Sequence, residues 1–265
     1  MTIEWLYFAL IGSVAGFFGG LLGIGGGSIT VPLLFFALQP LGLSDTDLMH
    51  VVLGTSFAAM VFNTIASTFF HHQKGYLPWK IVTPLVPAIV LGPLLGSFIA
   101  TLLEGDVLRF SFGLFQIAIA IYFFLPKHKK VEIVDKKPHP AILNSVAFVI
   151  GGVGSILGIG GGIIMVPFLD MMGMTMKKAI ATSAFTSCIT LLVSAISFLV
   201  LGLKNPISIP SHIGFIYLPA FVIIAIFAML TSPLGVRVVH KLPILPLKRV
   251  FAIALALLGL LIIAG

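Results

Sequence analysis

Apolar residues run through this chain in blocks about as long as a membrane-spanning helix. A hydrocarbon core about 30 Å thick requires about 20 predominantly apolar residues in a helix. The pattern therefore predicts an all-α integral membrane protein. The blocks fall near residues 50–70, 78–101 and 109–125 in the first half of the chain, and near 179–202, 212–236 and 250–264 in the second.

Two further apolar segments, 5–37 and 141–169, are too long for one ordinary span and are interrupted by glycine. Their centres read GIGGG, at Gly23–Gly27 and at Gly158–Gly162. Each glycine inside a helix costs about 1 kcal/mol relative to alanine, so such a run favours a break. We expect each segment to be broken into two half-helices.

The two interrupted segments resemble one another. Residues 16–34 and 151–169 align through the glycine run and through the Val-Pro pair that follows it. We expect Pro32 and Pro167 near the start of the second half-helix, where proline is tolerated. The likeness continues beyond these segments, where Gly54-Thr55-Ser56 corresponds to Ala181-Thr182-Ser183. The chain thus divides into a first repeat (1–125), a linker (126–140) and a second repeat (141–265).

The composition excludes an ordinary soluble domain. Hydrophobic residues make up 59% of the chain and charged residues only 9%, and the mean hydropathy is +1.19. Soluble domains carry about 25% charged residues. The net charge of +7 is typical of basic cytoplasmic loops. We therefore expect the lipid bilayer, and no nucleic acid, as a partner.

The basic residues discriminate between two topologies. If each glycine-rich segment crosses the membrane once, the basic residues divide almost evenly between the two sides. If each returns as a hairpin, all of them except Arg109 and Lys204 lie on one side. Because cytoplasmic loops are enriched in lysine and arginine, we expect hairpins, inverted repeats and a cytoplasmic linker. Both termini and the acidic segment Asp45–Asp47 then lie outside in a multi-pass membrane protein.

The GIGGG runs have two interpretations. Glycine permits close helix approach in membranes, which is our interpretation for Gly12, Gly16, Gly92, Gly96 and Gly202. Irregular backbone at membrane depth, in contrast, is tolerated only inside protein or beside a wet cavity. The half-helix that follows, from Ser28 or Ile163, would present free N–H groups and a positive dipole end, which favours an anion.

Polar residues form a stripe on one face of the following helix. Thr182, Thr186, Thr190 and Ser194 recur every four residues and share a helix face. Ser56, Asn63, Thr64 and Ser67 occupy the matching face in the first half. Such hydroxyls often bond to their own backbone, which is the structural interpretation. They can also donate to an oxyanion without adding a charge.

No charged side chain is expected at the centre of a span. All eight acidic residues fall in predicted termini or loops, so the usual carboxylate of a cation or proton relay is absent. Known hydrolase, phosphate-loop and metal-ligand motifs do not occur. The single cysteine, Cys188, excludes an intramolecular disulfide. We therefore expect no catalytic residue, metal or cofactor, and a neutral site for a small anion.

The paired GIGGG…VP segments and the Thr-Ser that follows each resemble the sulfite exporter TauE/SafE family. The resemblance covers essentially the whole chain. It implies an inner-membrane permease for sulfur-containing anions such as sulfite or organosulfonates, and it implicates both glycine runs with Thr55, Ser56, Thr182 and Ser183. With the polar stripe, the candidate substrate-binding residues are Gly23, Gly25, Gly26, Gly27, Ser28, Thr55, Ser56, Asn63, Gly158, Gly160, Gly161, Gly162, Thr182, Ser183, Thr186 and Thr190.

Three hypotheses follow. The first is a secondary transporter of sulfite, other sulfur oxyanions or organosulfonates. The second is a carrier of another small anion, such as a carboxylate. The third is a membrane enzyme or assembly scaffold that transports nothing. The direction of transport, the coupling ion and the formation of a homo-oligomer stay open.

Overall fold

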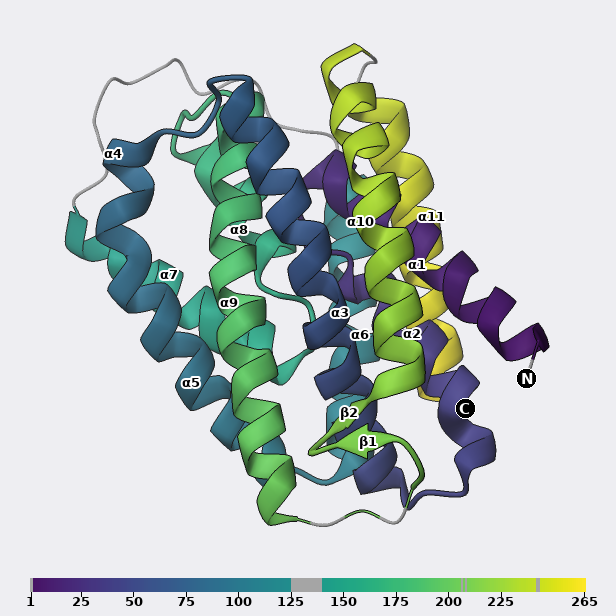
Figure 1. The fold of residues 1–265 in the computed structure, drawn as a ribbon. Helices are drawn as coiled ribbons and strands as arrows, with labels where there is room; N and C mark the ends of the chain where they lie inside the picture. The colour runs from purple at the N-terminus through teal and green to yellow at the C-terminus, as the bar shows by residue number, and fades with distance from the viewer. Residues whose placement is uncertain (1, 125–139, 206, 208, 242–243) are drawn as a thin grey trace.

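The computed structural model describes residues 2–124, 140–205, 207, 209–241 and 244–265, and nearly all of them are helical. The chain folds into a bundle of helices that run along or across one long axis (Figure 1). The elements are α1 (Thr2–Leu22), α2 (Gly27–Leu38), η1 (Gln39–Leu41), α3 (Asp45–Gln73), α4 (Trp79–Val82), η2 (Thr83–Leu85), α5 (Val86–Leu102), α6 (Gly105–Phe124), α7 (Pro140–Ile156), α8 (Gly162–Met171), α9 (Met176–Lys204), β1 (His212–Ile213), β2 (Ile216–Tyr217), α10 (Leu218–Lys241) and α11 (Ile244–Ala264).

The predicted all-α membrane fold is confirmed. Within the described residues, six helical segments are long and apolar enough to cross a membrane: Glu4–Leu22, Asp45–Gln73, Trp79–Leu102, Gly105–Phe124, Met176–Lys204 and Leu218–Val238. Four shorter apolar helices accompany them. Large apolar side chains such as Leu6, Phe98, Leu102 and Leu230 are exposed on the outer faces, as a lipid-facing surface requires.

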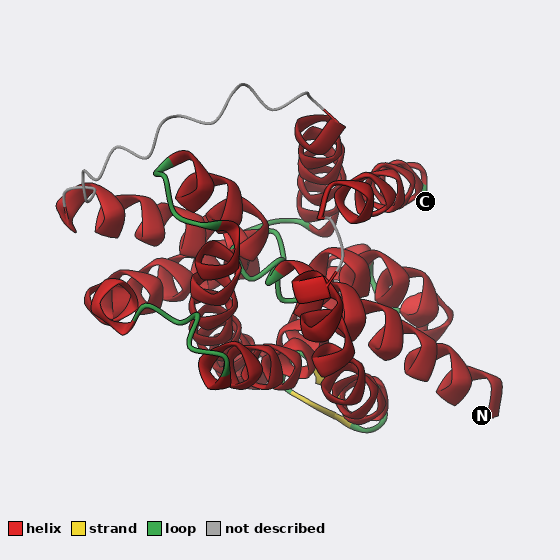
Figure 2. Cartoon of the chain, turned by 90° about the horizontal axis from the view of Figure 1, so that it is seen from above, coloured by secondary structure: helices red, strands yellow, loops and turns green. Residues whose placement is uncertain are grey.

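One span differs from the prediction at its start. The apolar block 212–236 was expected to be one helix, but its first six residues form a short antiparallel hairpin in which His212 pairs with Tyr217 and Ile213 with Ile216. The left-handed conformations of Ser211 and Gly214 turn the chain there. The hairpin lies at the periphery of the bundle (Figure 2).

Both glycine-rich segments are broken helices, as the sequence predicts. The first becomes α1 and α2, and the second becomes α7 and α8. The prolines, however, lie deeper in the second half-helix than the sequence predicts. Pro32 and Pro167 lie inside α2 and α8, five residues after the first residue of each helix. At that depth a proline removes a helix hydrogen bond, so each leaves a carbonyl group that requires another donor.

The acidic residues also lie closer to helices than predicted. Asp45 and Asp47 are in the first turn of α3, and Asp106 is in the first turn of α6. Asp170 is in the last turn of α8. Acids favour helix N-termini because the helix dipole is positive there, which explains three of the four positions. Glu132 and Asp135 lie outside the described residues.

The first helix of each half packs along a helix of the other half: α1 lies along α10, and α7 lies along α5. Glycines permit the close approach. A Cβ atom on Gly12 or Gly16 would meet the backbone of α10, and one on Gly92 or Gly96 would meet the backbone of α7. Gly202 packs on the backbone of β1–β2 at Gly214–Phe215. These positions have the packing role that the sequence predicts for them.

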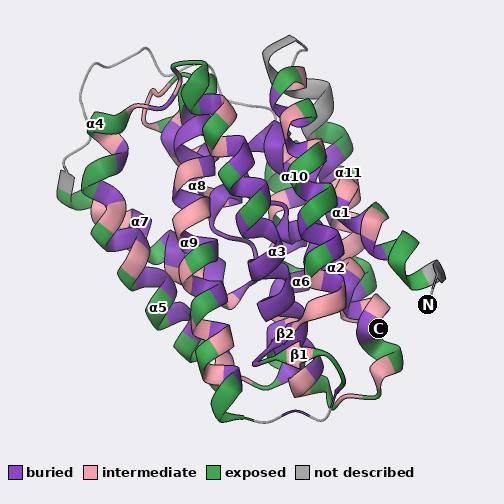
Figure 3. Ribbon diagram, in the orientation of Figure 1, coloured by how far each residue is buried: buried purple, intermediate pink, exposed green. Residues whose placement is uncertain are grey.

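Helices α3 and α9 form the centre of the bundle and pack against each other. Of the candidate spans, α3 is the most deeply buried, and its buried residues continue into the middle of the molecule (Figure 3). Lys177, at the start of α9, lies 3.5 Å from the hydroxyl of Tyr76, just after the end of α3. The two helices thus run in opposite directions, and both polar stripes lie on them.

Candidate functional site

The two breaks have the same backbone conformation. We name residues 23–26 glycine loop 1 and residues 157–161 glycine loop 2. In loop 1 the φ angles of Gly23, Gly25 and Gly26 are 67°, 84° and 89°. In loop 2 those of Gly158, Gly160 and Gly161 are 74°, 67° and 75°. Only glycine adopts this left-handed region without a steric cost. The glycine spacing that the two runs share therefore encodes the same turn twice.

The two loops contact each other. A Cβ atom on Gly27, the first residue of α2, would collide with the carbonyl oxygen of Gly158. In the reciprocal contact, a Cβ atom on Gly162, the first residue of α8, would lie 2.6 Å from the carbonyl oxygen of Gly23. Each half-helix therefore begins against the loop of the other half. The structure brings all the predicted glycines into one place.

The starts of α2 and α8 are buried and lack capping side chains. Gly26 and Gly161 are the N-cap residues, and neither helix receives a side-chain cap. The first N–H groups of a helix have no partner inside it, and the helix dipole adds a positive potential there. No lysine, arginine, aspartate or glutamate is among the buried side chains of the described residues. Backbone groups therefore dominate the electrostatics of the loops.

Ser183 connects the two loops. Its hydroxyl donates to the carbonyl oxygen of Gly23 (2.7 Å) and also lies 3.0 Å from that of Gly162. A hydroxyl has one proton, so the two carbonyl groups share it. Thr186, one turn later on α9, donates to the carbonyl oxygen of Ser183 (3.1 Å). In this structure Ser183 therefore stabilises the contact between the loops.

Asn63 attaches α3 to loop 1. Its Nδ2 atom donates to the carbonyl oxygen of Gly25 (2.9 Å) and contacts the sulfur of Met60 (3.9 Å). Its Oδ1 atom is buried and has no hydrogen-bond partner among the described residues. The amide nitrogen is therefore directed at loop 1, whereas the amide oxygen remains available as an acceptor.

Three hydroxyls on α2, α3 and α9 are buried without a hydrogen-bond partner in the described structure: those of Ser28, Ser56 and Ser187. Ser28 is the second residue of α2, and Ser56 occupies on α3 the position that Ser183 has on α9. The Ser187 hydroxyl lies beside Gly162. A buried hydroxyl without a partner costs about 1–3 kcal/mol, so these groups are candidate donors to a ligand.

The other predicted residues make contacts away from the loops. The Thr55 hydroxyl accepts from the backbone N–H of Tyr217 (2.9 Å), at β2. Thr182 lies 3.8 Å from the sulfur of Met174, after α8. Thr190 is buried on the stripe of α9. These contacts of Thr55 and Thr182 attach the central helices to the connecting segments.

Sequence reasoning missed Gln116. Its Nε2 atom, on α6, donates to the carbonyl oxygen of Ser28 (2.8 Å), the group whose helix partner is removed by Pro32 four residues later. Its Oε1 atom is buried without a partner in the described part of the chain. The signal was an amide in the otherwise apolar span 109–125. Ser232 was missed in the same way; its hydroxyl donates to the backbone carbonyl of Asn63 (3.2 Å).

Comparison with known proteins identifies the family. The family model described as Sulfite exporter TauE/SafE matches residues 8–262. The chain belongs to this family. A "Probable membrane transporter protein" of Haemophilus influenzae is 36% identical over 95% of both chains. One of Methanocaldococcus jannaschii is 30% identical over 95% of this chain and 92% of its own. One of Bacillus subtilis, YunE, is 27% identical over 97% and 96%.

No solved structure matches the chain. Membership of the TauE/SafE family and the apolar helices together make the chain a multi-pass membrane transporter. The names of the relatives give no substrate.

Proposed function

We propose that this TauE/SafE protein is a secondary transporter of small anions, sulfite or related sulfur oxyanions and organosulfonates first among them. The anion binds where the two glycine loops meet. The observation that carries the proposal is the pair of buried, uncapped helix starts at Gly26–Gly27 and Gly161–Gly162, surrounded by neutral donors. N–H groups and hydroxyls complement an oxyanion without the cost of burying a cation.

The described conformation is a closed one. Each half-helix start contacts a carbonyl group of the opposite loop, at Gly158 and at Gly23, so an anion requires the loops to move apart. The shared proton of Ser183 is one of the contacts that must break. We therefore propose that transport alternates between this closed contact and states in which the loops separate toward one side.

We also propose that the halves are inverted repeats. Support comes from helix directions. Gly12 and Gly16 contact α10 at Ile224 and Ala228, so α1 runs parallel to α10. Gly92 and Gly96 contact α7 at Phe148 and Gly152 in the same sense, so α7 runs parallel to α5. Because α10 starts at the end with β1–β2 and α5 at the end with α4 (Figure 1), α1 and α7 start at opposite ends.

The orientation in an inner membrane follows from charge. Lys74, Lys80, Lys177 and Lys178 lie at the end with α4, whereas Arg109 and Lys204 lie at the end with β1–β2. The enrichment of lysine in cytoplasmic loops supports an orientation with the first end inside and both termini outside. The linker at 126–140 lies outside the described residues, apart from Pro140. Lys74→Cys and Lys204→Cys, each in a Cys188→Ser background, should react with an impermeant maleimide from opposite sides.

Flux in proteoliposomes tests the function. Sulfite, thiosulfate and acetate should be compared with empty liposomes and with liposomes that contain the Gly161→Leu variant. Saturable flux of the two sulfur oxyanions that exceeds acetate flux supports the proposal. A preference for acetate assigns the protein to the carboxylate carriers. Flux of none of these anions, by protein that is folded and inserted, contradicts anion transport.

A further inference from the structure

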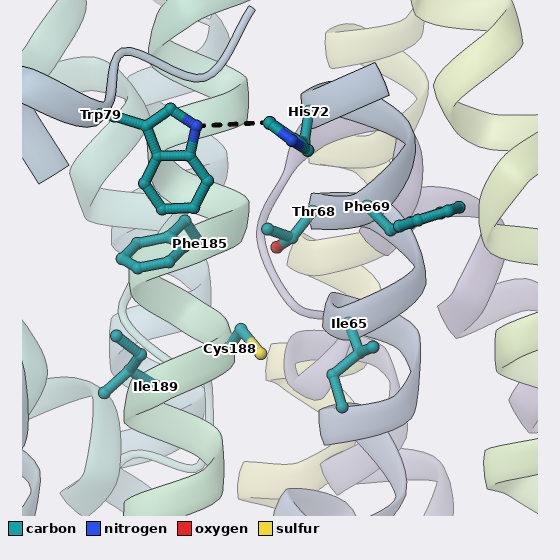
Figure 4. A pocket seen from close by; sticks show the side chains of 8 residues that line it. All are labelled: Ile65, Thr68, Phe69, His72, Trp79, Phe185, Cys188 and Ile189. Atoms are coloured by element: carbon teal, nitrogen blue, oxygen red, sulfur yellow. Dashed lines mark hydrogen bonds between the residues drawn. The ribbon is translucent and has the colours of Figure 1, made fainter. Parts of the chain in front are cut away.

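A groove opens on the side of the bundle between α3 and α9, at the end that carries α4. It has a volume of about 260 Å³. Ile65, Phe69 and Trp79 at its edge are each about half exposed, so the groove opens toward the hydrocarbon of the membrane. Its walls are shown in Figure 4 and consist of Ile65, Thr68, Phe69, His72, Trp79, Phe185, Cys188 and Ile189.

The upper end of the groove has the chemistry of a membrane interface. The indole N–H of Trp79 donates to Nδ1 of His72 (3.3 Å) across the groove (Figure 4). Phe185 packs edge-on against Trp79 with ring centroids 5.6 Å apart. Tryptophan is enriched where hydrocarbon meets lipid headgroups. The groove therefore extends from the headgroup region toward the membrane interior.

Basic residues surround this upper end. Lys74, Lys80, Lys177 and Lys178 are all exposed there. The ammonium group of Lys177 lies 5.3 Å from the centroid of the Tyr76 ring, which holds it beside the α3–α4 connection. Among the described residues, one acidic side chain, that of Asp170 at the end of α8, lies in the same region. The charge beside the groove is thus strongly positive, whereas the groove itself is apolar.

We propose that this groove binds one acyl chain of a phospholipid whose anionic headgroup lies among the four lysines. The apolar groove excludes water and faces lipid chains, so a chain is the occupant that its chemistry accepts. Lysines near the membrane surface select anionic headgroups, by about fivefold each. A zwitterionic lipid would satisfy the groove but not the lysines.

The bound chain would lie close to glycine loop 1. Ile65, in the wall of the groove, directly follows Thr64 in the chain. The methyl group of Thr64 is 3.7 Å from where a Cβ atom on Gly25 would stand. The groove lies between α3 and α9 at the end that carries α4. These helices contact the loops through Asn63 of α3 and Ser183 of α9. An anionic lipid would therefore set the spacing of the two halves beside the closed loops.

Cys188 provides the test, because it is the single cysteine of the chain and lines the groove. The full-length protein is placed in nanodiscs of phosphatidylcholine alone or with phosphatidylglycerol. The alkylation rate of Cys188 by a membrane-permeant maleimide is then measured. Phosphatidylglycerol should slow the reaction at least about fivefold. The Lys177→Gln/Lys178→Gln variant should lose most of this protection, because two of the four lysines are removed.

Lys204→Gln is the matched control, since Lys204 is an exposed lysine at the opposite end of α9. It should keep the full protection. Equal alkylation rates in the two lipids would overturn the proposal. Undiminished protection in the double variant would overturn it as well. So would an equal loss of protection in Lys204→Gln, because the effect would then be one of overall charge.

Discussion

The two glycine loops share one backbone but differ in their side-chain partners. In the second half, Ser183 donates to two loop carbonyl groups, and the hydroxyls of Ser194 and Ser155 are 2.6 Å apart. At the matching positions of the first half, the hydroxyls of Ser56 and Ser67 are buried without a partner among the described residues. The repeat thus duplicates the loop conformation, but Ser183 bonds to both loops whereas its counterpart Ser56 has an unused hydroxyl.

The prolines show a second difference. Pro32 leaves the carbonyl group of Ser28 without its helix partner, and Gln116 of α6 supplies the missing donor. The alignment of Leu108 with Leu247 places Leu255 of α11 opposite Gln116. Leucine has no donor, so it cannot make the corresponding bond after Pro167. The bond from α6 to α2 thus has no counterpart from this position of α11.

The largest expected effect comes from leucine at Gly26 or Gly161. Both glycines have a left-handed φ, and a Cβ atom would lie 2.7 Å from the sulfur of Met60 at Gly26 or 2.9 Å from Ile150 at Gly161. Either substitution should abolish flux in proteoliposomes, because the loop cannot keep its shape.

Gly173→Leu is the matched control for these variants. Gly173 has the same left-handed conformation (φ 83°), but nothing lies within 4 Å of its Cβ position. Gly173→Leu should therefore cost only the backbone strain of a left-handed leucine, about 1–2 kcal/mol, without a steric clash. It should retain transport. Wild-type flux in Gly26→Leu and Gly161→Leu would show that the loops are not the site.

Gln116→Leu should have the next largest effect. It leaves the buried carbonyl group of Ser28 without a donor, which costs about 1–3 kcal/mol. Chemical denaturation in detergent should show this loss of unfolding free energy. Leu255→Met, at the matching position on α11, should cost less than about 1.5 kcal/mol. If the two losses are equal, the hydrogen bond to Ser28 does not anchor α2.

Much of this fold could be predicted because the decisive signals are local. Apolar length identifies the spans, and the GIGGG run identifies a break, since no helix tolerates so many glycines. The same signals predicted the close packing at Gly16 and Gly96. The hairpin β1–β2 was missed because its residues are as apolar as the helix that follows them.

The contacts of the polar residues were predicted less completely, because the hydrogen-bond partner of a polar group can be far from it in the sequence. The Nδ2 atom of Asn63 donates to the carbonyl oxygen of Gly25, 38 residues earlier in the chain, and also contacts the sulfur of Met60. Gln116 lies 88 residues from Ser28 in the chain, so no periodicity connects them. The Thr55 hydroxyl likewise accepts from the backbone N–H of Tyr217, which is far from it in the chain. Which hydroxyls stay unused depends on tertiary packing alone.

Ser183→Ala should destabilise the protein moderately, by about 1 kcal/mol, the typical net contribution of a hydrogen bond. The carbonyl groups of Gly23 and Gly162 would lose the proton that they share. The loss should appear as a lower midpoint of thermal unfolding in detergent. Ser197→Ala is a suitable control, because its hydroxyl bonds only to its own helix at Val193 in the described contacts. An unchanged midpoint for Ser183→Ala would mean that the loops meet without its help.

Ser56→Ala should have the smallest effect on stability and separates the two halves most sharply. The Ser56 hydroxyl is fully buried and has no partner in the described structure, so its removal takes no hydrogen bond from the closed protein. If it donates to the anion instead, the loss of a hydrogen bond to a charged group should weaken binding about 10- to 150-fold.

The measurement pairs unfolding with sulfite affinity for Ser56→Ala and Ser183→Ala under one set of conditions. We expect Ser56→Ala to keep the wild-type unfolding midpoint and to lose affinity. Ser183→Ala should lower the midpoint, because its proton lies between the loops in the closed state. A Ser56→Ala variant with unchanged affinity and a lowered midpoint would assign Ser56 the same structural role as Ser183. The Ser56 hydroxyl would then not bind the substrate, and the anion would depend on the backbone N–H groups of α2 and α8 and on the hydroxyls of Ser28 and Ser187.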